Sequence, residues 1–196
     1  MTTLLVEDNA VPGAGSFRSE ALAIDYREVE FQGHKYPGVG LNDVLQKDLA
    51  RQIGRVVRHG LGFHPEFKMA FMRLTRKQDE HPFHIHADNV VGAKWAAVWY
   101  LTPDDLCVGG TAFWTHCATG ADGIPEGFDH TSEDAAQLDK DGQDESLWSM
   151  NGLVAMRFNR MVVYPCSLFH SRYPLRFPGE TLLDGRLVGV AFFNEA

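Results

Sequence analysis

The sequence has few of the features that mark secreted or membrane-spanning proteins. It contains only three cysteines (Cys107, Cys117 and Cys166) in 196 residues, and none has CxxC spacing. This usage indicates a reducing compartment and thiols with a packing role, so we expect a cytoplasmic protein. The longest uncharged apolar run, Trp95 to Leu101, has seven residues, whereas a spanning helix needs about 20. The N-terminus lacks the basic and apolar regions of a signal peptide, so we expect neither a leader nor a membrane span.

Positive charge is also scarce. The net charge is −8, which argues against nucleic acid and anionic membranes as partners. The excess comes from one segment, because residues 115–150 hold nine acidic residues and one lysine while the rest of the chain has 17 of each sign. We therefore assign the acidity to an insert at 116–149. It has little apolar periodicity, and a loop of this length is usually functional or disordered, so we expect a lid or a solvated loop.

The hydrophobic pattern changes along the chain from helical to strand-like. Residues 42–59 have apolar side chains at three-to-four spacing, which predicts an amphipathic helix, whereas residues 9–20 predict a loop or mobile arm. Later segments are short, rich in β-branched and aromatic residues, and bounded by turn residues. We predict strands at 67–76, 83–90, 94–102, 110–115, 152–164 and 186–193. The chain thus reads as a single domain over 1–196, with a helical part at 1–66 and a β core at 67–196.

The densest group of metal-ligand residue types is the segment that begins at His81 and ends at Asp88. On a strand, residues two apart point to one face, so His84, His86 and Asp88 would share a face. A further ligand must come from elsewhere, and His170 is the best candidate. Two histidines and one carboxylate leave three positions of an octahedron open, which suits non-haem Fe(II).

Further motifs follow in order along the chain. They are a strand ending in Tyr-Leu at 100–101, Gly109-Gly110-Thr111, a Tyr164-Pro165 strand end before His170, and Arg186 on the last strand. In this order they resemble the 2-oxoglutarate/Fe(II)-dependent oxygenases, in particular the prolyl-hydroxylase-like branch, over roughly residues 67–196. The resemblance implies a mainly β fold, a double-stranded β-helix of the jelly-roll, cupin-like type, with N-terminal helices outside.

The resemblance also implies roles for individual residues. His86, Asp88 and His170 match the ligands of Fe(II), and Arg186 matches the residue that binds the far carboxylate of the co-substrate 2-oxoglutarate, for which a guanidinium is well suited. Tyr100 falls where a tyrosine touches the same carboxylate, although a core aromatic is an equal reading. The implied enzyme is a dioxygenase that uses O2, releases succinate and CO2, and hydroxylates its substrate.

Two departures from the family pattern stand out. Arg186 follows His170 by 16 positions, more than the ten or so of many relatives, so Arg172 and Arg176 are rivals for its role. We favour Arg186 because it alone begins an apolar strand. Many relatives have Ser or Thr two positions after the arginine, where this chain has Val188.

Other interpretations stay open. His84-x-His86-x-Asp88 also begins a binuclear zinc hydrolase motif, but Asn89 stands where that motif needs another histidine. The fold could instead belong to a non-catalytic binding module, or to a cupin-type metalloenzyme that does not use 2-oxoglutarate. Asp88 argues against halogenation, because halogenating relatives lack this carboxylate.

The substrate is the least determined part of the interpretation. We expect an amino acid, a peptidyl residue or a small metabolite, and an acidic lid would favour a cationic or zwitterionic one. His84, Trp114 and Arg73 are candidate substrate-binding residues, and Trp95 and Trp148 are further candidates for the pocket wall.

Overall fold

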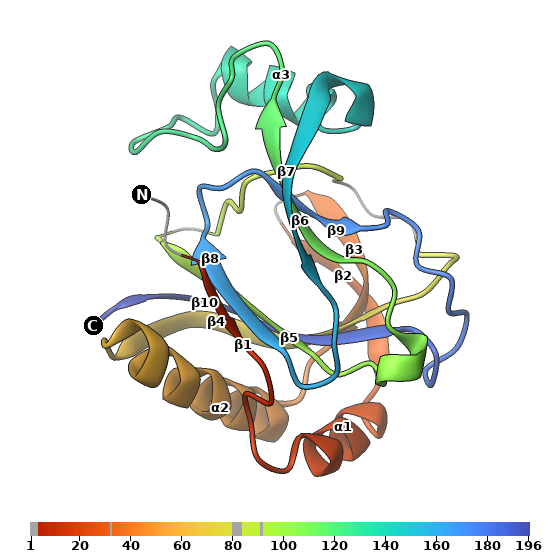
Figure 1. Cartoon of the computed structure of the whole chain (residues 1–196). Coiled ribbons are helices and arrows are strands. Elements are labelled where there is room, and N and C mark those ends of the chain that lie inside the picture. The colour runs from red at the N-terminus through yellow and green to blue at the C-terminus, as the bar shows by residue number, and fades with distance from the viewer. Residues whose placement is uncertain (1–3, 32, 80–83, 91) are drawn as a thin grey trace.

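The computed structural model describes residues 4–31, 33–79, 84–90 and 92–196. Within them the strands are β1 Leu5–Glu7, β2 Tyr26–Phe31, β3 His34–Gly40, β4 Pro65–Thr75, β5 Trp95–Tyr100, β6 Gly110–His116, β7 Trp148–Ala155, β8 Met161–Pro165, β9 His170–Tyr173 and β10 Arg186–Glu195. The large sheet has the order β1-β8-β5-β10-β4-β3-β2, and the small sheet has the order β7-β6-β9. The paired strands are antiparallel, and the two sheets face each other (Figure 1). Phe113 of β6 meets Tyr164 of β8 edge-on between them, with 5.3 Å between ring centroids.

This architecture is the expected jelly roll, and the prediction of a mainly β fold is confirmed. The strand pairing determines which side chains enter the space between the sheets. β10 lies between β5 and β4, and Val188 is opposite both Tyr100 and Arg73. Side chains alternate along a strand, so Arg186, two residues earlier, points to the same inner face.

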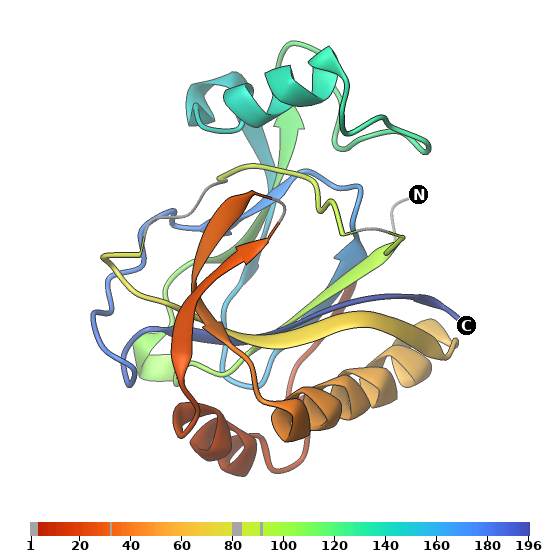
Figure 2. The same ribbon diagram turned by 180° about the vertical axis from the view of Figure 1, so that it is seen from behind.

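Two helices cover the outer face of the large sheet, as Figures 1 and 2 show. They are α1 Ala14–Leu22 and α2 Asp43–Leu61. The prediction at 42–59 is confirmed by α2. It begins where the Asn42 side chain accepts a hydrogen bond from the Leu45 amide, and it ends at Gly62, whose φ of 81° suits glycine. Leu45, Leu49 and Ile53 of α2 are buried against the sheet.

The N-terminal part differs from the prediction. Residues 9–20 are not a loop throughout, because α1 begins at Ala14 and buries Phe17 against Trp99, with 4.7 Å between ring centroids. The described residues before β4 also form strands besides the helices: β1 extends one edge of the large sheet, and β2 and β3 extend the other. The charged side chains of these edge strands face solvent, so they carry little of the apolar pattern that marks buried strands.

Two strand predictions in the β core were also wrong. Residues 152–164 form parts of two strands, β7 and β8, which are separated by a turn where Asn159 has a φ of 60°. The described part of 83–90 is not a regular strand, and only His86 forms a bridge, to His170. His81 and its neighbours at 80–83 lie outside the described residues.

The acidic insert is ordered as a cap at one end of the two sheets, at the top of Figure 1. It contains the helix α3, Glu133–Asp141, and a short 3-10 helix at Glu145–Leu147. A second short 3-10 helix, Asp104–Leu106, lies outside the insert, between β5 and β6. The Ser132 side chain accepts a hydrogen bond from the Ala135 amide and so caps α3. The insert is therefore not without secondary structure, as its low apolar periodicity suggested.

None of the helices formed by the described residues has the length and apolar character needed to cross a membrane.

Candidate active site

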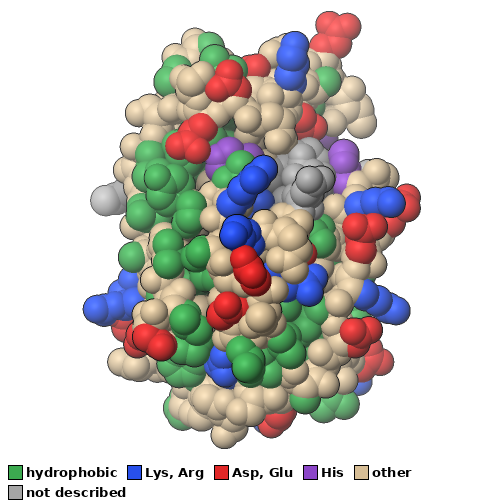
Figure 3. All heavy atoms as spheres, turned by 90° about the vertical axis from the view of Figure 1, so that its right-hand side faces the viewer, with side chains coloured by type: hydrophobic (Ala, Val, Ile, Leu, Met, Phe, Trp, Pro, Cys, Tyr) green, Lys and Arg blue, Asp and Glu red, His purple; other side chains and the backbone are tan. Residues whose placement is uncertain are grey.

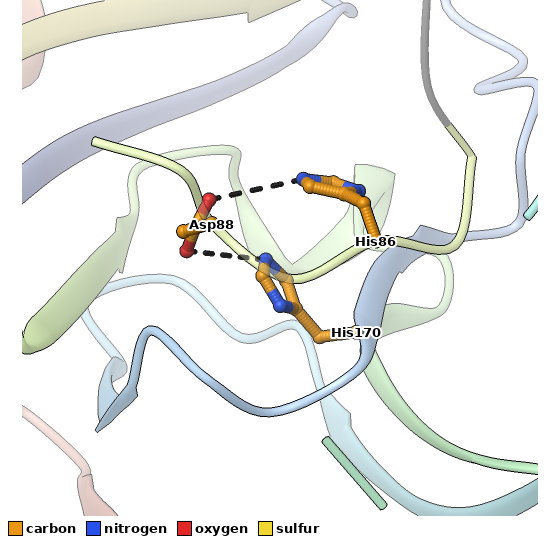
Figure 4. A group of neighbouring side chains, drawn as sticks. All are labelled: His86, Asp88 and His170. Atoms are coloured by element: carbon orange, nitrogen blue, oxygen red, sulfur yellow. Dashed lines mark ion pairs between the residues drawn. The ribbon is translucent and has the colours of Figure 1, made fainter. Parts of the chain in front are cut away.

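His86, Asp88 and His170 meet between the two sheets, and we call them the ligand triad (Figure 4). Each offers one ligand atom, and these atoms all lie within 4.8 Å of one another. The Asp88 carboxylate is 3.8 Å from Nε2 of His86 and 3.4 Å from Nε2 of His170. The bridge that joins His86 to His170 holds the two histidine segments together, with backbone hydrogen bonds of 3.0 and 2.8 Å. The fold thus gathers residues that are 84 positions apart in the chain.

The two imidazole rings are oriented by the backbone. Nδ1 of His86 lies 3.1 Å from the carbonyl oxygen of His84, and Nδ1 of His170 lies 2.9 Å from that of Leu168. A carbonyl only accepts, so each Nδ1 carries the hydrogen and each Nε2 directs its lone pair toward Asp88. Burial lowers the pKa of both imidazoles to about 4, which keeps them neutral and available as metal ligands at neutral pH.

Asp88 is a buried carboxylate without adequate compensation from the protein. Its Oδ2 atom has no hydrogen-bond partner among the described residues, and burial raises its pKa to about 6. Leaving a carboxylate oxygen buried and unsatisfied is costly, whereas a divalent cation between Asp88 and the two imidazoles would satisfy it. Two neutral imidazoles and one carboxylate form a donor set that suits Fe(II).

The ligand triad opens into a cavity of about 950 Å³ between the sheets and the insert. Its wall is largely apolar near the large sheet, where Phe71, Val190 and Phe192 face inward, and Phe128 and Leu138 close it from the insert. From the side shown in Figure 3, basic and histidine side chains gather where the insert meets the sheets. The cavity is large enough for a co-substrate and a second small molecule.

Arg186 lies at the inner end of this cavity. Only 7% of its surface is exposed, and its Nε atom has no partner among the described residues. The guanidinium lies over the Tyr100 ring, 5.5 Å from the centroid. The Tyr100 hydroxyl in turn shares a hydrogen bond of 2.6 Å with Oγ1 of Thr111. Arg186, Thr111 and Tyr164 line the cavity, while Tyr100 stands behind them, so this end offers a carboxylate a guanidinium and hydroxyl groups.

The structure separates the remaining candidates. Arg73 lines the cavity, as do Phe192 and Trp148, but Trp114 and Trp95 are absent from the described lining. Trp114 packs behind the site, where its indole N–H donates to Oγ of Ser171 over 3.0 Å. Arg176 is exposed outside the cavity, which removes one rival of Arg186.

His84 also faces away from the cavity. It is buried, and its Nε2 atom lies 3.2 Å from a carboxylate oxygen of Glu145 in the insert. Its imidazole therefore contacts the insert, and only its backbone carbonyl reaches the ligand triad, through His86. The described lining does not support the expectation that His84 faces the substrate.

Three residues of the site escaped the sequence analysis or were underrated there. Thr111 and Tyr164 belong to the motifs that led to the family resemblance, yet only the pairing of the strands shows that they face inward. Arg172 follows His170 by two positions on β9, so the alternation of side chains predicts that it points to the same face. It lines the cavity together with Arg186, so both arginines are present in one site.

The insert supports both segments that supply ligands. The amide of Ile85 donates to the carbonyl oxygen of Gly142 over 3.0 Å, and the amide of Phe169 donates to that of Asp122 over 2.9 Å. A side chain at Gly142 would collide with the Ile85 carbonyl oxygen, 2.2 Å from the position of a Cβ atom. The insert therefore packs closely against the residues that precede His86 and His170.

Several solved structures have the same fold as this chain. The non-haem alpha-ketoglutarate-dependent epimerase SnoN from nogalamycin biosynthesis matches with a TM-score of 0.62 and 13% identity, over 100% of this chain and 79% of SnoN. The carbocyclase SnoK from the same biosynthesis matches with a TM-score of 0.59 and 14% identity, over 98% of this chain and 80% of SnoK. HygX from Streptomyces hygroscopicus, solved with nickel and 2-oxoglutarate bound, matches with a TM-score of 0.56 and 15% identity, over 100% of this chain and 83% of HygX.

At these identities the likeness shows a shared fold. No curated protein matches the sequence. A family model does match, over residues 1–174, which include the ligand triad and end before Arg186. The chain therefore belongs to the family of unknown function DUF6445.

Proposed function

We propose that this protein is a non-haem Fe(II)- and 2-oxoglutarate-dependent dioxygenase. The observation that carries the proposal is the ligand triad, with its ligand atoms within 4.8 Å of one another and an unsatisfied carboxylate oxygen on Asp88. The buried Arg186 at the inner end of the same cavity supports the use of 2-oxoglutarate. The fold shared with the alpha-ketoglutarate-dependent SnoN and SnoK agrees with this assignment.

Each residue then has a physical role. His86, Asp88 and His170 would hold Fe(II), which would supply the site where oxygen and the co-substrate bind. Arg186 would hold the far carboxylate of 2-oxoglutarate, and Thr111, whose hydroxyl is held by that of Tyr100, would orient it. When bound, iron and 2-oxoglutarate supply the oxidising chemistry, in which O2 is consumed and succinate and CO2 are released. The protein contributes orientation and a site shielded from water.

For the substrate, we propose hydroxylation of an unactivated C–H bond in an amino acid, a peptidyl residue or a small metabolite. The presence of Asp88 favours hydroxylation over halogenation, because the carboxylate fills the position that a halide would need. The order of motifs favours the prolyl-hydroxylase-like branch. Phe128 and Leu138 of the insert line the cavity, which supports a role of the insert as a lid that excludes water.

The test is an anaerobic titration of metal-free protein with Fe(II) and then 2-oxoglutarate, followed in the visible spectrum. We expect a weak charge-transfer band that is lost in His170→Ala and Asp88→Ala and retained in the control His64→Ala, because His64 is exposed outside the site. Succinate formation in air then provides an assay for substrates.

The other outcomes identify the alternatives. Iron binding without a band on addition of 2-oxoglutarate would contradict the proposal and indicate a cupin-type metalloenzyme. No iron binding would also contradict it and indicate a binding module or a zinc protein.

A further inference from the structure

Arginine side chains from three strands face the same cavity. They are Arg73 of β4, Arg172 of β9 and Arg186 of β10. The strand pairing explains this convergence: Arg73 and Arg186 share the inner face of the large sheet, and Arg172 lies opposite Thr111 on the inner face of the small sheet. The three charges are close enough that Arg172 interacts electrostatically with both Arg186 and Arg73. Like charges collected in a low-dielectric cavity repel one another, so they favour a bound anion.

The part of the chain that the structure describes places no carboxylate directly beside two of these arginines. Among the described residues, no carboxylate oxygen lies within 4.0 Å of Arg172 or Arg186. Asp79 acts on Arg172 at longer range, but it forms an ion pair of 3.2 Å with Arg76. Arg172 does form a hydrogen bond with a neutral group: its Nε donates to the carbonyl oxygen of Leu175 over 2.8 Å.

Arg186 and Arg172 have different surroundings. Arg186 lies over Tyr100, away from the cavity mouth, and interacts electrostatically with Tyr100 and Tyr164. Arg172 is instead two residues beyond His170 on β9, so its side chain leaves the strand on the same face as that ligand. In the proposed function, Arg186 binds the far carboxylate of 2-oxoglutarate. The guanidinium of Arg172 then remains available to bind a different anion.

Arg73 extends the Arg172 position toward β3. Its guanidinium lies over the Tyr36 ring, 5.4 Å from the centroid, and Tyr36 also lines the cavity. Burial lowers the pKa of Arg73 only to about 10, so it is charged at neutral pH. The rest of the wall nearby is apolar, with Phe71, Phe128 and Leu138. The combination fits a molecule with an anionic head and an apolar body.

We infer that Arg172, together with Arg73, forms a second anion-binding site that holds a carboxylate or phosphate group of the substrate, distinct from the Arg186 site. Guanidinium groups bind both oxyanions through bidentate hydrogen bonds. This inference rests on the proposed function, because it assigns Arg186 to 2-oxoglutarate. The substrate class is then a small acid or phosphate ester with an apolar body.

The acidity of the insert does not oppose this inference. Of its acidic residues, all of which belong to the described part of the chain, only Asp139 lines the cavity. The side chains of the insert that face the cavity are otherwise apolar, aromatic or histidine. The acidic side chains of the insert thus lie mostly outside the cavity, whereas the arginines lie inside it. A bound substrate contacts the inside of the cavity.

The test measures binding by calorimetry, with no need for turnover. The probes share one body and differ in the head group: 4-phenylbutyrate, 4-phenylbutyl phosphate and neutral 4-phenylbutan-1-ol. Each is titrated into protein that holds Mn(II) and 2-oxoglutarate under anaerobic conditions, and also into metal-free protein. The variants are Arg172→Gln and Arg186→Gln, with Arg176→Gln as a matched control because Arg176 is exposed nearby in the chain. Binding of 2-oxoglutarate to each Mn(II)-loaded variant is measured separately.

We expect at least one anionic probe to bind tenfold or more tightly than the alcohol, since hydrogen bonds between charged groups are stronger than those between neutral groups. Arg172→Gln should abolish this preference and change 2-oxoglutarate affinity less than about threefold, and Arg186→Gln should do the reverse. Which anionic probe binds more tightly distinguishes a carboxylate from a phosphate substrate.

Equal binding of acid and alcohol, or no binding of either, would overturn the inference. An equal loss of 2-oxoglutarate affinity in Arg172→Gln and Arg186→Gln would also overturn it, because Arg172 would then belong to the co-substrate site. If 2-oxoglutarate failed to bind but the metal-free protein kept an Arg172-dependent preference for the anion, the proposed function would fail while the anion site remained.

Discussion

Asp88→Asn should make the metal-free protein more stable while it removes metal binding. The buried Asp88 carboxylate has its pKa raised from its usual 3.8 to about 6, because ionisation is disfavoured away from water. That difference corresponds to about 3 kcal/mol of lost stability once the folded carboxyl ionises. An asparagine has the same shape and no charge, but its buried amide also needs partners. We therefore expect a net gain of about 1–2 kcal/mol, or about 2–8 °C in Tm.

The pH dependence gives the sign of the effect. The folded pKa of Asp88 is higher than the unfolded pKa, so the stabilising effect of protonation is fully present below pH 3.8 and is lost as the pH rises through about 6. The electrostatic part of the advantage of Asp88→Asn should thus be about 3 kcal/mol at pH 7.5 and about half of that at pH 5, where the cost of the buried amide cancels most of it.

The assay is thermal unfolding of both proteins in EDTA, then in Mn(II) at increasing concentrations. Mn(II) should raise the Tm of the unmodified protein by mass action and should barely change that of Asp88→Asn, so the order of stabilities inverts. The exposed Asp25→Asn is the control and should change neither series. A lower Tm for Asp88→Asn than for the unmodified protein in EDTA at pH 7.5 would refute the reasoning, because Asp88 would then be well compensated without a metal.

Three further substitutions test the surroundings of the site. Gly142→Ala places a Cβ atom 2.2 Å from the Ile85 carbonyl oxygen, so it should displace the segment before His86. Mn(II) binding, measured by calorimetric titration, should weaken about tenfold or more. In the control Gly152→Ala the new Cβ meets no atom within 4 Å, and Mn(II) binding should not change. Tyr100→Phe removes the buried hydrogen bond of 2.6 Å to Thr111 and should lower the free energy of unfolding by about 1–2 kcal/mol and weaken 2-oxoglutarate binding; unchanged values in urea unfolding and calorimetry would contradict this role. Trp114→Phe removes the indole hydrogen bond to Ser171. It should lower the free energy of unfolding in urea by about 1 kcal/mol and leave the Mn(II) affinity unchanged. A large loss of Mn(II) affinity would mean that Trp114 positions His170.

Local patterns were enough to predict those parts of the protein whose cause lies in neighbouring residues. The apolar stripe and caps of α2 determine its position, and the apolar runs determine the strands that are buried between neighbours, such as β5 and β10. The order of motifs along the chain led to the family resemblance, and that resemblance implied one site made of His86, Asp88, His170 and Arg186. By contrast, β2 lies at the sheet edge and β3 beside it, and their exposed positions carry charged residues that solvent accepts.

Only the tertiary structure determined which side chains from distant segments lie next to one another. The pairing of β6 with β9 places Arg172 opposite Thr111, and the pairing of β10 with β4 places Arg73 near Arg186; both depend on registers between segments far apart in sequence. The same applies to the insert, whose composition resembles that of a solvated loop although Gly142 and Asp122 bind the backbone of the ligand segments. Residue types and their spacing determine which chemistry a chain can hold, but contacts between distant segments determine which charges a cavity collects, and hence which substrate it favours.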